Sequence, residues 1–63
     1  MFTPFDVVRL VHGIPDAGIA PGTEAVVLEV SDEPELHYEI EVVDDEGRTL
    51  YQAAVRPDQI EAI

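Results

Sequence analysis

The sequence predicts an all-β domain, and three observations support that fold class. From His37 to Val43 apolar and polar residues alternate, which is the period of a strand with one buried and one exposed face. β-branched and aromatic residues gather in short runs that end at turn-forming residues. No stretch has the spacing of an amphipathic helix. With 63 residues and no cysteine, we expect a single domain over residues 1–63, stabilised by one small core.

The first strand is expected from Phe5 to Val11, because this run is rich in β-branched and aromatic residues. Val7 and its neighbour Val8 are both apolar, so alternation alone does not assign the faces. We expect Phe5 and Val7 to point into the core, with Leu10 or Val11 as a further inward residue.

A long loop should follow from His12 to Gly22, because its three glycines and two prolines exclude a helix. Pro21 and Gly22 suit the two central positions of a type II turn. We expect Ile14 and Ile19 to fold back over one end of the core.

The second strand is expected from Thr23 to Val30, and its apolar run predicts a central, strongly bent strand. Ala25 is expected where another strand approaches the backbone closely. The segment Ser31–Pro34 should form the turn into the next hairpin.

That hairpin spans Glu35–Val55, with Asp44–Gly47 as a four-residue loop that Gly47 closes. Two registers, one residue apart, are compatible with this loop. One of them would turn Leu50 and Gln52 inward and bury the Gln52 amide without a partner, so we favour the register that keeps both residues outside. The favoured register places five residues on the inner face: Tyr38, Ile40, Val42, Tyr51 and Ala53. It pairs Val43 with Arg48, Ile40 with Tyr51, Tyr38 with Ala53, Val42 with Thr49, Glu39 with Gln52, and Glu41 with Leu50.

The segment Arg56–Ile60 is expected to form one helical turn with Pro57 at its first position, and Glu61–Ile63 the last strand. We expect Ile60 and Ile63 to be buried. Five strands, a long first loop and a helical turn before the last strand describe a small SH3-like barrel, a closed form that removes most exposed strand edges.

Eight short motifs are spread over nearly the whole chain: Asp6-Val7-Val8, Ile14-Pro15, Gly18, Pro21-Gly22-Thr23, Val26-Val27-Leu28-Glu29-Val30, Tyr38-Glu39-Ile40-Glu41-Val42, Asp45-Glu46-Gly47-Arg48-Thr49 and Pro57-Asp58-Gln59-Ile60. Together they resemble those of an uncharacterised family of short bacterial proteins known only as a domain of unknown function. The resemblance implies an SH3-like barrel and supplies no catalytic residues.

A more distant similarity is to the small barrels of the KOW type. Gly22, Val27 and Val30 fall where those barrels place a glycine and two valines, and Ala25 stands where they place a second glycine.

The charge balance limits the partners that the chain can bind. Fourteen Asp and Glu residues oppose three Arg and no Lys, which gives a net charge of −11. Such a surface repels nucleic acid and anionic membranes and attracts basic proteins. Acidity that only keeps the chain soluble explains the same composition. The N-terminal residues do not form a signal peptide and no apolar run is long enough to span a bilayer, so we expect a cytoplasmic protein.

The residues needed for covalent catalysis are scarce, so we expect no enzymatic activity and no cofactor. Cys and Lys are absent, and Ser31, the only serine, lies in a turn. His37 and Glu39 project from one strand face and are weak candidates for metal ligands, with His12 or Glu41 as a further ligand. A solvated polar face explains these residues with fewer assumptions.

The remaining feature is the acidic outer face and loop of the hairpin, which we expect to bind a basic protein partner. Antitoxins, immunity proteins and inhibitors that mimic a phosphate backbone work in this way. A metal- or ligand-binding barrel using His37 and Glu39 is the alternative, followed by a nucleic-acid-binding barrel. The sequence does not define the oligomeric state. The expected partner-binding residues are Glu39, Glu41, Asp44, Asp45 and Glu46.

Overall fold

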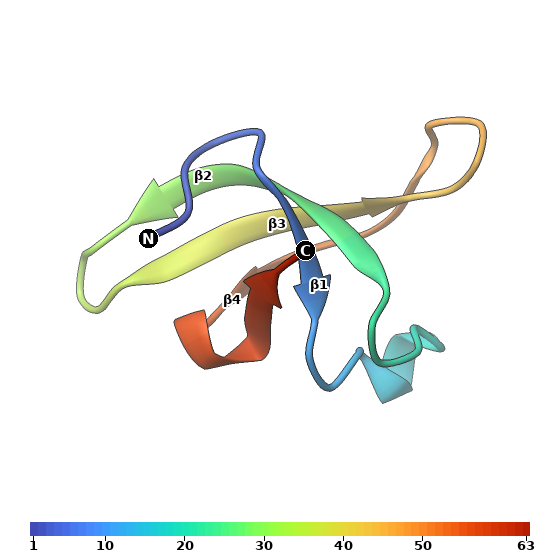
Figure 1. Ribbon diagram of the computed structural model, residues 1–63, viewed down its shortest axis with the longest axis horizontal. Coiled ribbons are helices and arrows are strands. Elements are labelled where there is room, and N and C mark those ends of the chain that lie inside the picture. The colour runs from blue at the N-terminus through green and yellow to red at the C-terminus, as the bar shows by residue number, and fades with distance from the viewer.

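The computed structural model describes residues 1–63 as one antiparallel five-stranded sheet, which confirms the all-β prediction (Figure 1). The strands lie in the order β4-β3-β2-β1-β5, so β4 and β5 form its edges. The long first loop and the helical turn before the last strand are also present. The elements are β1 (Val7–Leu10), η1 (Pro15–Ala17), β2 (Glu24–Ser31), β3 (His37–Val43), β4 (Thr49–Val55), η2 (Pro57–Gln59) and β5 (Ile60–Ala62). Both η elements are single 3₁₀ turns, and no helix is long and apolar enough to cross a membrane.

The loop between β1 and β2 covers one end of the core, as predicted. Ile14 and Ile19 form a β-bridge; Ile19 is buried and Ile14 packs against the core. Gly13 passes so close to the following turn that an added Cβ would lie 2.3 Å from the carbonyl oxygen of Ile19. Gly22 has a φ of +84°, and the Thr23 amide donates to the Ala20 carbonyl at 3.3 Å, which closes the predicted turn.

The predicted inward residues of β1 are confirmed for Leu10 and wrong for Phe5 and Val7. Val8 and Leu10 are buried, whereas Val7 is 47% exposed and Phe5 is 79% exposed. Val8 lies opposite the buried Ala25, which fixes the inner face of the strand. Phe5 has a positive φ of 74° and lies outside the strand, so its side chain does not follow the strand alternation.

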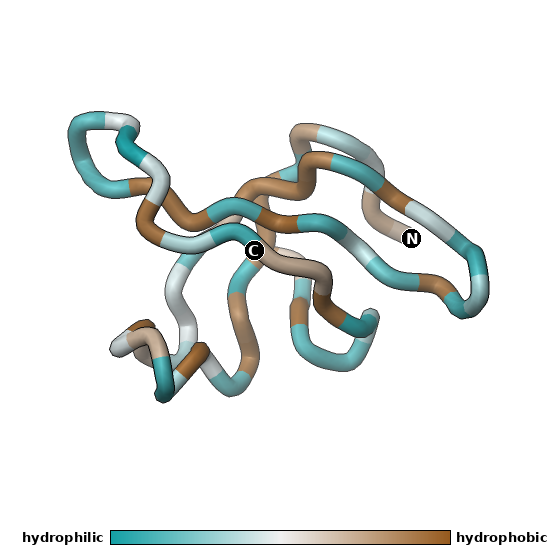
Figure 2. The backbone as a smooth tube through the Cα atoms, turned by 180° about the vertical axis from the view of Figure 1, so that it is seen from behind, coloured by the Kyte–Doolittle hydropathy of each residue, from teal (hydrophilic) through white to brown (hydrophobic).

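The inner face of the β3–β4 hairpin agrees with the prediction. Tyr38, Ile40 and Val42 are buried, and Tyr51 and Ala53 are half-buried. Hydrophobic and hydrophilic residues alternate along most of β3 (Figure 2), and its buried positions are Tyr38, Ile40 and Val42.

The predicted pairing register of the hairpin is wrong by two residues. Ile40 lies opposite Ala53 rather than Tyr51, and Tyr38 lies opposite Val55. The difference arises near the loop, where the Asp44 amide donates to the Arg48 carbonyl and a bulge follows between the Val42 and Val43 pairs. A shift of two residues preserves the strand faces. The cross-strand pairs are Tyr38–Val55, Glu39–Ala54, Ile40–Ala53, Glu41–Gln52, Val42–Tyr51 and Val43–Thr49.

Two residues beside the bulge show its effect on the faces. Thr49, expected to face Val42 inside, is exposed, and its hydroxyl donates to the Glu41 carboxylate. Leu50 is unpaired in the ladder and 61% exposed, so it lies outside the core as predicted.

The last strand begins at Ile60, one residue earlier than expected, because Ile60 already pairs with Leu10. Ile60 is buried as predicted, but Ile63 lies beyond the strand and is 58% exposed, so its predicted burial is wrong. Tyr38 closes the other end of the core, where its ring packs edge-on against Phe2 at 5.7 Å. The core consists of Val8, Leu10, Ile19, Ala25, Val27, Tyr38, Ile40, Val42, Val55 and Ile60.

Candidate protein-binding surface

The outer face of β2, β3 and β4 carries two cross-strand rows of side chains. In one row Glu39 of β3 lies between Glu29 of β2 and Ala54 of β4. In the next row Glu41 lies between Val26 and Gln52. Residues that pair directly across an antiparallel ladder point to the same face, with Cβ atoms about 5 Å apart. The middle of the sheet therefore presents three glutamates on one surface.

The pairing of Glu29 with Glu39 is electrostatically unfavourable within this chain. Like charges placed directly opposite each other destabilise a sheet. Neither carboxylate accepts a hydrogen bond or forms an ion pair with another side chain. Ala54, on the other side of Glu39, is too small to cover its neighbour. The negative charge of this row is thus left for water or for a cation from outside.

The three arginines do not neutralise the outer face. Arg48 pairs with Asp44 and Glu46, Arg56 pairs with Asp58, and Arg9 forms no ion pair. Three of the fourteen acidic residues are thus in ion pairs, and the other eleven form none. Arg9 lies between Glu24 and Glu61 in the ladder, away from the row of Glu29 and Glu39.

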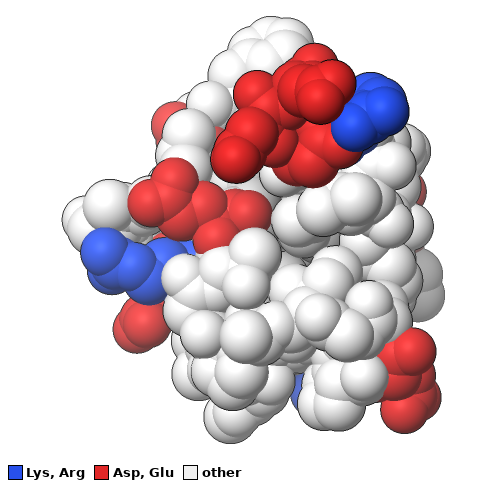
Figure 3. Space-filling model, turned by 90° about the vertical axis from the view of Figure 1, so that its right-hand side faces the viewer, with Lys and Arg blue, Asp and Glu red and all other residues white.

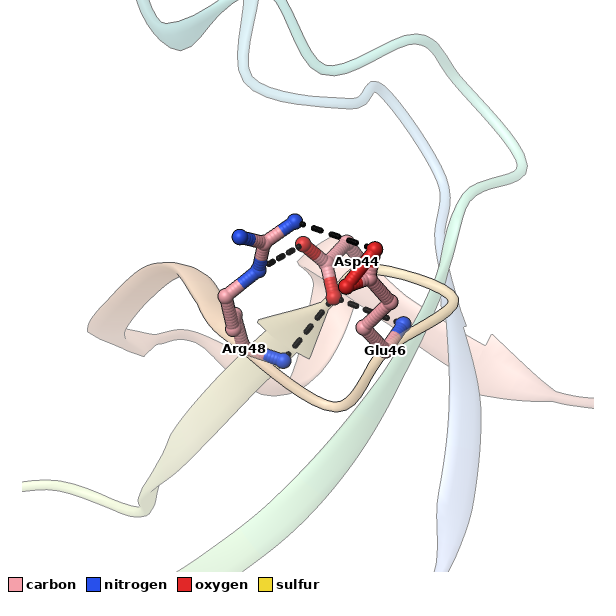
Figure 4. A network of polar contacts seen from close by, with 3 residues as sticks. All are labelled: Asp44, Glu46 and Arg48. Atoms are coloured by element: carbon pink, nitrogen blue, oxygen red, sulfur yellow. Dashed lines mark hydrogen bonds and ion pairs between the residues drawn. The ribbon is translucent and has the colours of Figure 1, made fainter.

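Asp44 has a structural role in the loop between β3 and β4 (Figure 4). Its Oδ1 accepts hydrogen bonds from the backbone amides of Arg48 and Glu46, each at 2.9 Å, and its Oδ2 accepts one from Arg48 Nε at 3.0 Å. The Arg48 amide is the largest cause that lowers the pKa of Asp44 below its ordinary value of 3.8. These hydrogen bonds to the Asp44 carboxylate stabilise the closed conformation of the loop.

Asp45 and Glu46 form the exposed tip of that loop. The Asp45 carboxylate has no partner, and Glu46 pairs with the exposed guanidinium of Arg48 at 3.5 Å. Acidic side chains gather beside a basic one at the end of the molecule that carries this loop (Figure 3). The tip extends the negative surface of β3 beyond the sheet.

The weak metal candidates do not converge with other ligands. His37 lies at the start of β3 opposite Ser31, and its Nδ1 is 2.9 Å from the carbonyl oxygen of Glu35. His12 is exposed in the first loop. No three His, Asp or Glu side chains lie close enough together to hold a metal ion.

A shallow depression of about 210 Å³ lies beside Glu41 on the same outer face. Four of its six lining residues are hydrophobic, and the other two are glutamates. The lining residues are Val7, Glu24, Ala25, Val26, Glu41 and Val43.

Sequence reasoning missed Glu29, which completes the acidic row. Strict alternation along β2 puts Glu29 on the same face as the buried Val27. A bulge between Val27 and Glu29 reverses this, so that Glu29 pairs with Glu39 outside. The signal in the sequence is a single carboxylate within an apolar run, since burying it without a partner is costly.

Comparison with known protein families gives a match that covers all five strands. The model of a domain of unknown function, DUF4926, matches residues 5–62. The chain belongs to this family. No curated protein and no solved structure matches the DUF4926 chain.

Proposed function

We propose that this DUF4926 domain is a non-catalytic binding module that captures a basic protein partner on the outer face of β2 and β3. The observation that supports this most is the position of Glu39 between Glu29 and Ala54. Two carboxylates side by side, without a cation from their own chain, favour binding of a cation from another molecule.

The net charge of the domain supports the same proposal at longer range. A formal charge of −11 raises the rate of association with a basic surface through long-range attraction. This rate enhancement weakens as salt screens the charges. The acidic loop tip at Asp45 and Glu46 extends the region of negative electrostatic potential beyond the sheet. This arrangement suits a protein that occupies a nucleic-acid-binding groove in its partner, as inhibitors, immunity proteins and antitoxins do.

The fold supports a binding role by analogy. Five strands, a long first loop and a 3₁₀ turn before the last strand are the parts of a small SH3-like barrel, and we propose that the domain is of this type. We place it among short bacterial accessory proteins. The metal-binding and nucleic-acid-binding alternatives have no comparable support, because no ligand cluster forms and the arginines are dispersed.

The test is capture of a partner from extracts of the native cell by immobilised domain. Glu39→Lys combined with Glu41→Lys should leave the fold intact and reduce the captured amount of a basic protein. The matched control is Asp16→Lys with Glu33→Lys, because both residues are exposed, lie outside the strands, and change the net charge equally. Equal capture by the two variants would contradict a specific site on the outer face.

A further inference from the structure

The two edges of the sheet differ in how they are protected. β5 has three residues and carries Glu61 in its centre, and both a short edge and a charge discourage pairing with another strand. β4 has seven residues, from Thr49 to Val55, and none of them is charged or is proline. It is the only strand in this acidic chain without a charged residue.

The outer edge of β4 is unpaired along its length. β4 pairs with β3 alone, and no backbone group of Leu50–Val55 takes part in a hydrogen bond outside that ladder. In an antiparallel pair every second residue points its amide and carbonyl away from the partner strand. The far side of β4 therefore presents a row of free donors and acceptors.

The inner face of β4 is only partly covered in the middle of the strand, although Val55 at its end is buried. Tyr51 and Ala53 belong to the inner face but remain only half-buried, whereas the matching residues of β3 are buried. A strand added beyond β4 would extend the sheet and cover both. Its outward side chains would lie beside Gln52 and Ala54.

The geometry points to strand addition at the β4 edge, where an extended segment of the basic partner pairs with β4 and places a Lys or Arg beside Ala54. Strands lie about 4.8 Å apart, so that side chain would be roughly 10 Å from the backbone of Glu39. A lysine or arginine side chain spans much of this distance, and the methyl group of Ala54 leaves the path open. The cation would meet Glu39 and relieve its repulsion with Glu29.

A second copy of this chain is a poorer occupant of the same edge. Pairing of two β4 strands would bring together two chains that each carry a formal charge of −11 and would add no cation near Glu39. A basic segment supplies both the backbone partners and the missing charge. This inference rests on the proposed function for its choice of a basic partner.

The experiment uses the whole domain and three capped peptides as long as β4. In the first, lysine alternates with valine; the second has the same sequence with every backbone nitrogen methylated; in the third, glutamate replaces lysine. Affinity is measured by titration at low salt, and hydrogen exchange of the β4 amides is followed by NMR. The lysine peptide should bind and protect alternate amides within Leu50–Val55. N-methylation should weaken binding about tenfold or more, because it removes the donors of the new ladder.

The outcomes separate this inference from the proposed function. Equal affinity of the methylated and unmethylated lysine peptides would overturn strand addition while leaving charge-based capture standing. Equal binding of the lysine and glutamate peptides, with β4 protected, would support strand addition and contradict the basic partner. Absence of binding by all three peptides would overturn strand addition. If the domain dimerises without peptide and the same amides are protected from exchange, the edge is occupied by a second copy. That result would also overturn strand addition by a basic segment.

Two variants of equal charge complete the test. Ala54→Lys places a cation beside Glu39 within the chain and blocks the space for the incoming side chain. Ala17→Lys adds the same charge in η1, at a residue that is also exposed and lies outside the sheet. Ala54→Lys should weaken binding of the lysine peptide several-fold more than Ala17→Lys, and an equal effect would contradict the assigned position.

Discussion

Glu39 lies directly opposite Glu29 across the β2–β3 ladder, and its neighbour on β4 is Ala54. The two carboxylates and the methyl group of this row form no interaction that stabilises the folded domain. The same row is well suited to bind a cation from another protein. Removing the charge of Glu39 is therefore expected to raise the stability of the free domain and to lower its affinity for the partner.

Removing the charge of Glu39 should stabilise the free domain. Glu39→Gln is expected to raise the free energy of unfolding by about 0.2–1 kcal/mol at low salt, because it ends the repulsion with Glu29. The gain should shrink as salt is added. Urea unfolding at two salt concentrations measures it. Glu33→Gln, an exposed change in a loop, is the control, and an equal gain there would show that only net charge matters.

The charge of Asp44 should contribute to stability in a pH-dependent way. The pKa of Asp44 in the folded state lies below its ordinary value of 3.8, chiefly because the Arg48 amide donates to the carboxylate. A lowered folded-state pKa gives stability that is present above the unfolded-state pKa and is lost as the pH falls through the folded-state pKa.

Asp44→Asn should therefore lower the melting temperature at neutral pH, and the difference from the natural protein should close as the pH drops below about 4. Thermal unfolding over a range of pH values provides the measurement. Asp45→Asn, at an exposed neighbour whose carboxylate makes no hydrogen bond, should have little effect. A constant difference at all pH values would show that the charge of Asp44 is not responsible.

The observed faces of the hairpin predict a large contrast between two aliphatic residues. Ile40 is fully buried, so Ile40→Ala should cost about 2–5 kcal/mol, enough to unfold much of a domain this small. Leu50 is 61% exposed, and Leu50→Ala should change stability by less than about 0.5 kcal/mol. Chemical denaturation compares them, and a large loss at Leu50 would place it in the core.

Gly13 should tolerate substitution less well than Gly18. Both have positive φ angles, of 64° and 71°, so alanine is strained at either position. At Gly13 the new methyl group would also lie 2.3 Å from the Ile19 carbonyl oxygen, whereas Gly18 faces open space. Gly13→Ala should therefore lower the melting temperature more than Gly18→Ala, and equal losses would contradict this close approach.

The strand faces that follow a clean alternation could be predicted from the sequence, and those beside bulges could not. In β3, Tyr38, Ile40 and Val42 alternate with polar residues, which leaves one arrangement that buries the apolar side chains. The faces of β1 were ambiguous because Val7 and Val8 are adjacent and equally apolar.

Bulges account for the differences in β2 and in the pairing of the hairpin. The loop closed by Asp44 and the bulge beside it shift the hairpin pairing by two residues, which leaves the faces unchanged but gives Glu39 a different neighbour. The bulge in β2 brings Glu29 to the outer face. Periodicity therefore predicted Glu39 and Glu41 as outer residues, whereas the pairing of Glu39 with Glu29 and Ala54 required the three-dimensional structure.

The affinity of the Glu39→Gln variant for the captured basic protein tests the central claim most directly. Titration at low salt should give an affinity about tenfold or more below that of the natural domain, although the variant itself is more stable. The control Glu33→Gln, which removes the same charge from a loop, should bind within about twofold of the natural domain. An unchanged affinity for Glu39→Gln, or an equal loss in both variants, would contradict a binding site on the outer face of β2 and β3.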